Sequence, residues 1–76
     1  MNYIWLSFAS EETGKNLGIC VVEALTLDEA LKKAWSLKLN PGGTVAGYSM
    51  DDEQFQKQKV ELNRLYTRQE MTDLGH

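Results

Sequence analysis

The residues best suited to bind a ligand lie in the middle of the chain. The stretch LNPGGTVAGY at 39–48 holds the only proline and three of the six glycines. Consecutive backbone N–H groups in a glycine-rich loop can bind phosphate or carboxylate oxygens. Asn40, Gly42, Gly43 and Thr44 are therefore candidates for contact with a phosphate or ribose group.

The same loop has a simpler structural interpretation. Asn40 precedes a proline, which disfavours helix, and the paired glycines can supply positive φ angles where a helix ends. The loop matches neither GxxxxGK[ST] nor GxGxxG, and it follows a predicted helix instead of opening one. An anion bound here would need help from side chains. The sequence leaves open whether the loop binds a ligand or only turns the chain.

Arginines and aromatic residues could supply that help. Arg64 and Arg68 are four residues apart, so on a helix they would share one face, and the arginine fork suits phosphate. The alternative is that both are solvated surface charges. Trp5 and Tyr48 are candidates for stacking on a nucleobase, although core packing is the common role of such rings. The other aromatic residues considered for stacking are Tyr3, Trp35 and Tyr66.

The sequence offers no catalytic set and no set of metal ligands. Cys20 is the only cysteine and lies in an apolar run, and the only histidine is His76. Neither a Cys/His pair nor a zinc site has the residues it needs. Asp51, Asp52 and Glu53 are explained by the start of a helix, where negative charge is favourable, rather than by a metal site. We expect a non-enzymatic protein without a cofactor or a metal.

Composition limits the partners. Eight basic and eleven acidic residues give a net charge of -3, which is the wrong sign for general binding of nucleic acid polymers. No apolar run approaches the ~20 residues of a membrane span. The N-terminal residues lack the basic start of a signal peptide. We therefore expect a cytoplasmic protein with no membrane partner.

Hydrophobic periodicity predicts a small α+β domain with a ββαβα order. Residues 2–9 and 17–24 are expected to form an antiparallel hairpin of strands. A capping box at Thr26 and Glu29 predicts the start of a helix with one apolar stripe. A third strand follows at 44–50, and residues 51–74 continue as a second helix without a breaker.

A chain of this size favours assembly. A 76-residue domain buries only about 60% of the surface that its unfolded chain exposes. A three-stranded sheet with two helices leaves apolar surface uncovered, and an exposed sheet edge invites a second copy. We expect residues 1–76 to form a single domain, with 1–50 as a ββαβ core. Residues 51–74 are expected to be a helix that promotes homo-oligomerisation.

Three segments carry a resemblance to a known family: WLSFAS, LGICVVEALTLDEALKKA and LNPGGTVAGY. Together they resemble small bacteriophage and prophage proteins that share an aromatic first strand, an LGxxxVEA-like strand, a short helix and an NPGG loop. The likeness covers roughly residues 4–50. Many members of that family carry an acidic residue after the paired glycines, where this chain has Thr44.

The resemblance implies a phage protein that acts against bacterial defence in the host cytoplasm. In one interpretation, an oligomer sequesters a nucleotide-derived immune signal, such as a cyclic nucleotide or an ADP-ribose derivative, and acts as a sponge. In the alternative, the protein binds a defence protein directly or serves as a regulatory adaptor of the phage. The glycine loop, the arginines and the aromatic residues favour the sponge, because a nucleotide pocket uses these three parts.

Overall fold

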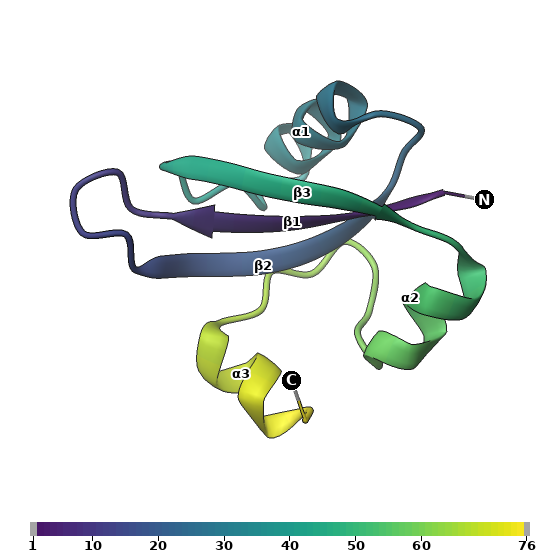
Figure 1. The fold of residues 1–76 in the computed structure, drawn as a ribbon. Helices are drawn as coiled ribbons and strands as arrows, with labels where there is room; N and C mark the ends of the chain where they lie inside the picture. The colour runs from purple at the N-terminus through teal and green to yellow at the C-terminus, as the bar shows by residue number, and fades with distance from the viewer. Residues whose placement is uncertain (1, 76) are drawn as a thin grey trace.

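The computed structural model describes residues 2–75, so His76 lies outside the described part of the chain. Its sheet contains β1 (Tyr3–Ala9), β2 (Asn16–Glu23) and β3 (Thr44–Met50) in the order β2-β1-β3 (Figure 1). Both pairs of neighbouring strands are antiparallel. The predicted α+β class, the hairpin of the first two strands and the third strand are confirmed.

The helix α1 (Leu27–Ser36) covers one face of this sheet (Figure 1). Its N-cap is Thr26, whose side-chain oxygen accepts a hydrogen bond from the N–H of Glu29 at 3.2 Å. The carboxylate of Glu29 accepts the N–H of Leu25, also at 3.2 Å, instead of the N–H of Thr26 that the predicted capping box requires. The helix therefore begins where the capping residues predict.

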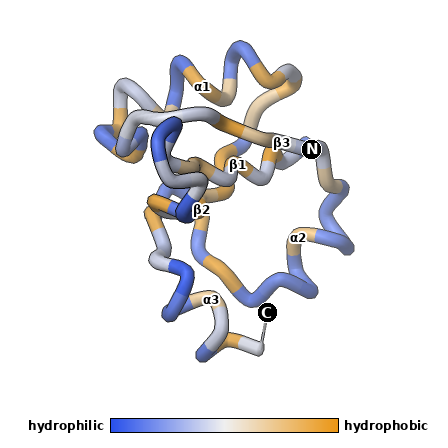
Figure 2. The backbone as a smooth tube through the Cα atoms, turned by 60° about the vertical axis from the view of Figure 1, so that its left-hand side comes forward, coloured by the Kyte–Doolittle hydropathy of each residue, from blue (hydrophilic) through white to orange (hydrophobic). Residues whose placement is uncertain are grey.

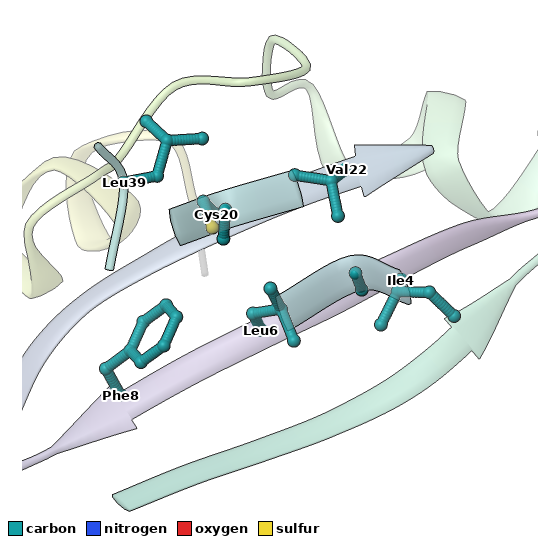
Figure 3. Packing of buried hydrophobic residues seen from close by; sticks show 8 residues of the cluster. Ile4, Leu6, Phe8, Cys20, Val22 and Leu39 are labelled. Atoms are coloured by element: carbon teal, nitrogen blue, oxygen red, sulfur yellow. The ribbon is translucent and has the colours of Figure 1, made fainter. Parts of the chain in front are cut away.

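The main core lies between α1 and the sheet (Figure 3). Alternate residues of β1 point toward α1, as the two-residue period of a strand requires. Cys20 is fully buried in this core, and burial raises the pKa of its thiol to about 11. The thiol thus stays neutral and acts as a small apolar group. The core residues are Ile4, Leu6, Phe8, Cys20, Val22, Ala30, Ala34 and Leu39.

The end of α1 differs from the prediction. The N–H of Lys38 donates to Trp35 O at 3.1 Å, and the N–H of Leu39 donates to Ala34 O at 2.8 Å. These two bonds form a Schellman motif, which requires a left-handed residue directly after the C-cap. Lys38 fills that position with a φ of 60°. The prediction that the paired glycines end this helix is therefore wrong.

Gly42 and Gly43 instead turn the chain into β3. Gly43 has a φ of 77°, and a Cβ atom at this position would overlap the carbonyl oxygen of Ala9. Gly42 has a φ of 93° and open space around its Cα. Gly43 therefore permits a close approach between two parts of the same backbone, at the point where β3 begins to pair with β1.

The single helix predicted over 51–74 is also wrong. The structure has α2 (Asp52–Gln58), an irregular segment at 59–67 and α3 (Arg68–Asp73), so residues 2–75 contain three helices. Both short helices start with a capping box, at Asp51 and at Thr67. Lys59 ends α2 in a left-handed conformation, with a φ of 57°.

Pairing with β2 explains why this helix is interrupted. Tyr66 and Ile19 exchange two backbone hydrogen bonds of 2.7 and 2.8 Å, and the N–H of Asn63 donates to Val21 O at 2.9 Å. These bonds satisfy backbone groups at the outer edge of β2, which a continuous helix would leave to solvent. Long-range pairing thus prevails over local helix propensity.

The second face of the sheet is only partly covered. The ring of Phe55 in α2 stacks on Tyr3 with 4.3 Å between centroids, and Met71 of α3 is buried. Burial raises the pKa of Tyr3, and a hydrogen bond with Asp52 raises it further. Figure 2 shows that most of α2 is hydrophilic, consistent with its attachment through few apolar residues. None of the helices within residues 2–75 has the length and apolar character to cross a bilayer.

Candidate functional site

An exposed tryptophan lies at the end of α1, close to the glycine loop. The side chain of Trp35 is 70% exposed, far more than a ring that packs in the core. It lines an open depression together with Ser36, Lys38 and Asn40, which we call the Trp35 depression. The depression thus combines a flat aromatic surface with a hydroxyl, an ammonium and a carboxamide group.

The backbone around the depression orients its polar groups. The carboxamide oxygen of Asn40 accepts a hydrogen bond from the N–H of Gly42 at 2.7 Å. This contact leaves the Nδ2 group of Asn40 as a donor for another partner. The Schellman motif holds the backbone of Lys38 directly after the helix. Asn40 therefore stays in the candidate site, through its side chain.

Lys38 lines the depression, and Lys32 lies one helical turn before Trp35. Neither Lys32 nor Lys38 forms an ion pair with any residue of the described range 2–75. Lys32 is one turn before Trp35 and Ser36, so it lies on the same side of α1. Asp28, one turn before Lys32, forms no ion pair with it. In a chain with a net charge of -3, this region has the charges that attract an anion.

The other predicted loop residues form the turn into β3 and the start of that strand. The N–H of Gly42 is taken by Asn40, so the expected row of free donors is interrupted there. Gly43 lies against the backbone of Ala9. The hydroxyl of Thr44 donates to the carbonyl oxygen of Ala9 at 3.4 Å. Gly42, Gly43 and Thr44 therefore have structural roles in this turn.

The two aromatic residues predicted to stack on a base stack on each other. Trp5 and Tyr48 are cross-strand partners, with ring centroids 5.8 Å apart and planes 18° apart. They lie on the face opposite α1, because the neighbouring residues Ile4 and Leu6 of β1 face the core with α1. The structure does not bring these rings together with the Trp35 depression.

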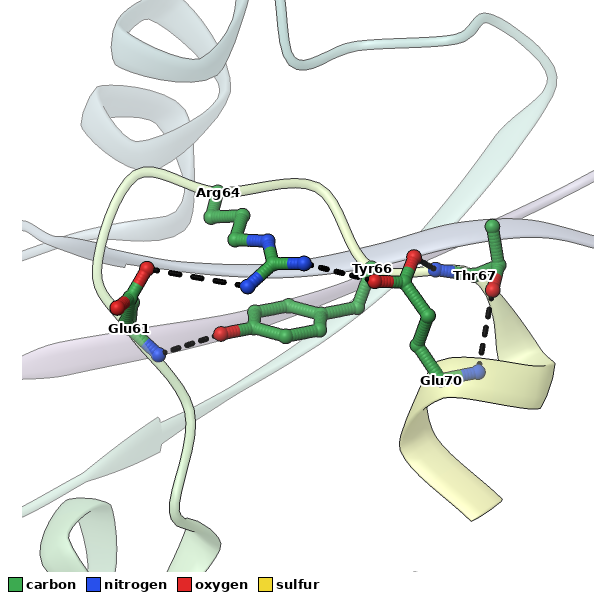
Figure 4. A network of polar contacts seen from close by, with 5 residues as sticks. All are labelled: Glu61, Arg64, Tyr66, Thr67 and Glu70. Carbon is green, nitrogen blue, oxygen red and sulfur yellow. Dashed lines mark hydrogen bonds and ion pairs between the residues drawn. The ribbon is translucent and has the colours of Figure 1, made fainter. Parts of the chain in front are cut away.

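The two arginines do not share a helix face, so that prediction is wrong. Arg64 lies in the irregular segment beside β2, whereas Arg68 is the first residue of α3. The guanidinium of Arg64 is 2.8 Å from Glu70 and 3.9 Å from Glu61, and it lies 4.5 Å from the ring centroid of Tyr66 (Figure 4). Arg64 thus holds the C-terminal segment together.

Glu70 is the centre of this second cluster. Its carboxylate accepts the N–H of Thr67 at 3.0 Å and also binds Arg64. The hydrogen bond from Thr67 lowers the pKa of Glu70, and Arg64 lowers it further. The shallow depression beside Arg64 is also lined by Glu70 and Asp73, which disfavour an anionic ligand. The predicted role of Arg64 in neutralising phosphate does not fit this arrangement.

Sequence reasoning considered Trp35 as a stacking ring but left it out of the site. The signal that could have placed it there is its position at the end of the helix, three residues before Lys38 and five before Asn40. The sequence prediction instead places Trp5 and Tyr48 in the site, and no local pattern shows that these two rings stack on each other.

Comparison with protein-family models, with curated proteins and with solved structures gives no significant match to this chain. Within residues 2–75, no three side chains of His, Cys, Asp or Glu are grouped in a way that could hold a metal ion. The candidate site is therefore argued from its geometry and charge.

Proposed function

We propose that this protein is a non-enzymatic binder that sequesters a nucleotide-type small molecule at the Trp35 depression. The observation that supports this is the exposed Trp35 side chain, which shares a depression with Lys38 and with an oriented Asn40 carboxamide. An indole provides a stacking surface for a base, and the N–H donors suit phosphate oxygens. Among residues 2–75, the lining of the depression includes no carboxylate or imidazole, the usual general acids and bases, so we expect the bound molecule to be released unchanged.

The resemblance of residues 4–50 to small phage proteins suggests the setting of this activity. A sponge for a cyclic nucleotide or an ADP-ribose derivative would lower the free concentration of an immune signal in the host cytoplasm. The proposed site differs from the one expected from the sequence. Trp35 takes the stacking role of Trp5 and Tyr48, and the lysines 32 and 38 take the role of the arginines.

The left-handed backbone of Lys38 allows a substitution that tests binding without destabilising the fold. A lysine in the left-handed region is less stable than glycine by about 1 kcal/mol. Lys59 adopts the same conformation at the end of α2, with a φ of 57°, and is not part of the depression. Lys38→Gly removes the backbone strain at this position together with an ammonium group of the depression. Lys59→Gly also removes backbone strain and an ammonium group, but outside the depression. The pair separates a binding role from a general effect of charge or stability.

Fluorescence of Trp35 tests the proposal. Trp5→Phe leaves Trp35 as the only tryptophan, since the chain has two. Titration with a cyclic dinucleotide and with ADP-ribose is expected to quench this emission and to raise the melting temperature by several degrees. Lys38→Gly should weaken binding about tenfold, the loss expected for one charge-assisted contact, and Lys59→Gly should leave it unchanged. Equal affinity of both variants, or no response to either ligand, would contradict the proposal.

The same indole supports a second candidate function. Tryptophan is a common anchor at protein interfaces, and Leu37, two residues after Trp35, is also 44% exposed. In this case the protein would block a host defence protein directly. We would then expect no response to nucleotides and a complex with a host protein that Trp35→Ala abolishes. Pull-down from host cells with the wild type and this variant distinguishes the two functions.

A further inference from the structure

The two outer edges of the sheet differ in how they are satisfied. The outer edge of β2 bonds to Asn63 and Tyr66. The outer edge of β3 has no partner strand among residues 2–75, because β3 pairs with β1 alone. Unpaired N–H and C=O groups along a strand are a template for another strand.

β3 also lacks the features that normally protect such an edge. Its sequence, TVAGYSM, contains no charged residue and no proline. Its pairing with β1 keeps one regular register from Tyr3↔Met50 to Ala9↔Thr44, without a bulge. Proteins that keep an edge strand solvated commonly use charges, proline or bulges to block further pairing. The edge of β3 is therefore competent to accept a strand.

Exposed apolar side chains lie next to this edge on both faces of the sheet. Tyr48 is 55% exposed on the face opposite α1. On the other face, Leu27 of α1 is 41% exposed and lies over Gly47, where a Cβ atom would come within 2.8 Å of the Leu27 side chain. A strand added to β3 would thus bury apolar surface on both sides.

We propose that a second copy of this chain adds its β3 antiparallel to the first, around a two-fold axis at Tyr48. The edge of β3 carries no charge, so it does not select a partner of opposite charge. Two copies of this edge can also meet without charge repulsion, as a two-fold interface requires. Asp51, Asp52 and Glu53 follow β3 directly. A parallel pair would place these carboxylates side by side, whereas an antiparallel pair separates them to opposite ends. The result is a continuous sheet of six strands.

The axis at Tyr48 follows from the aromatic rings. With this register the two copies of Tyr48 are directly opposite each other, and aromatic cross-strand pairs stabilise a sheet. Each Tyr48 already stacks on Trp5 of its own copy. The rings would then form a row of four across the dimer, on the face opposite α1. The dimer does not depend on the Trp35 depression, so failure of ligand binding would leave this inference standing.

Cysteine crosslinking tests both the dimer and its register. Tyr48→Cys places two cysteines on the axis, where the Cα separation of directly opposed residues, ~4.5–5.5 Å, permits a disulfide. The native Cys20 is buried and does not interfere. Ala46→Cys is the matched control on the same strand and face. Its two copies would be separated by four residues along the strands, roughly 14 Å, which is too far for a disulfide.

Three results are expected if the proposal holds. The wild type has a solution mass of twice 8.6 kDa by light scattering. Tyr48→Cys forms a disulfide-linked dimer under mild oxidation, and Ala46→Cys does not. Tyr48→Lys places two positive charges next to each other on the axis, so its solution mass is expected to be that of one chain. A single-chain mass for the wild type at high micromolar concentration would overturn the proposal. Crosslinking of Ala46→Cys as efficient as that of Tyr48→Cys would overturn the register.

Discussion

The two edges of the sheet show how the same backbone requirement is met in different ways. At β2, residues after α2 leave the helical conformation and bond to Ile19 and Val21. At β3, residues 2–75 provide no further strand, and β3 itself contains no charged residue. The C-terminal segment thus satisfies one edge of the sheet, whereas no strand from residues 2–75 satisfies the other.

The charged side chains show a parallel difference. Arg64, at the closed edge, binds Glu70 and Glu61 and stabilises the C-terminal segment. Lys38, in the turn before β3, forms no ion pair within residues 2–75. Arginine is the better phosphate ligand as a residue type, but here its neighbours occupy it. Whether a cation can bind a ligand is decided by what surrounds it.

Tyr66→Ala is expected to have the largest effect, because it opens the closed edge. The side chain is 5% exposed, its hydroxyl accepts the N–H of Glu61 at 2.8 Å, and its ring lies under Arg64. We expect a loss of about 4 kcal/mol in the free energy of unfolding, measured in urea. Tyr66→Phe, which loses only the hydroxyl contact, should cost about 1 kcal/mol. Equal losses for the two variants would show that the buried ring does not hold the edge.

Gly43→Ala is expected to destabilise the start of β3 by about 3 kcal/mol. The new methyl group would meet the carbonyl of Ala9 while the backbone keeps a positive φ. Gly42→Ala adds only the backbone strain, since nothing lies within 4 Å, and should cost about 1 kcal/mol. Urea unfolding of both variants measures the difference. If Gly42→Ala were the more damaging of the two, the assignment of the close approach to Gly43 would be incorrect.

Lys38→Gly and Lys59→Gly are each expected to raise the free energy of unfolding by about 1 kcal/mol. Both residues have a φ near 60° that glycine adopts without strain. Thermal unfolding should show similar gains, in contrast to the different effects of the two variants on ligand binding. A loss of stability in Lys38→Gly would mean that its side chain contributes more to the turn than its backbone strain costs.

The smallest expected effect is the response of the closed edge to acid. Hydrogen bonds from Thr67 and the nearby Arg64 lower the pKa of Glu70 in the folded protein. As the pH falls, Glu70 therefore binds a proton in the unfolded state before it does so in the folded state. The stabilisation from its carboxylate is present above the unfolded pKa and is lost as the pH falls through the folded pKa. Glu70→Gln should flatten this part of the pH dependence. Unfolding measured between neutral pH and pH ~3 tests it, and an unchanged profile would contradict the role of Glu70.

The sequence was most informative where local signals agree with one another. Alternation in the first strand and the cap at Thr26 appear in the structure as predicted, and Ala30 and Ala34 of the apolar stripe in the first helix are buried. The candidate site was predicted less well. The sequence predicts Asn40 for the site but not Trp35, because the exposure of Trp35 depends on how α1 packs on the sheet.

The amino-acid sequence alone determined the α+β class, the three strands, the first helix and the burial of Cys20, because these depend on periodicity and capping within a few residues. Only the tertiary structure decided that residues 59–67 leave the helix to pair with β2, that Lys38 ends α1 and that Arg64 is occupied by glutamates. Each of these depends on backbone groups or charges far apart in the chain, whose contact no local pattern encodes.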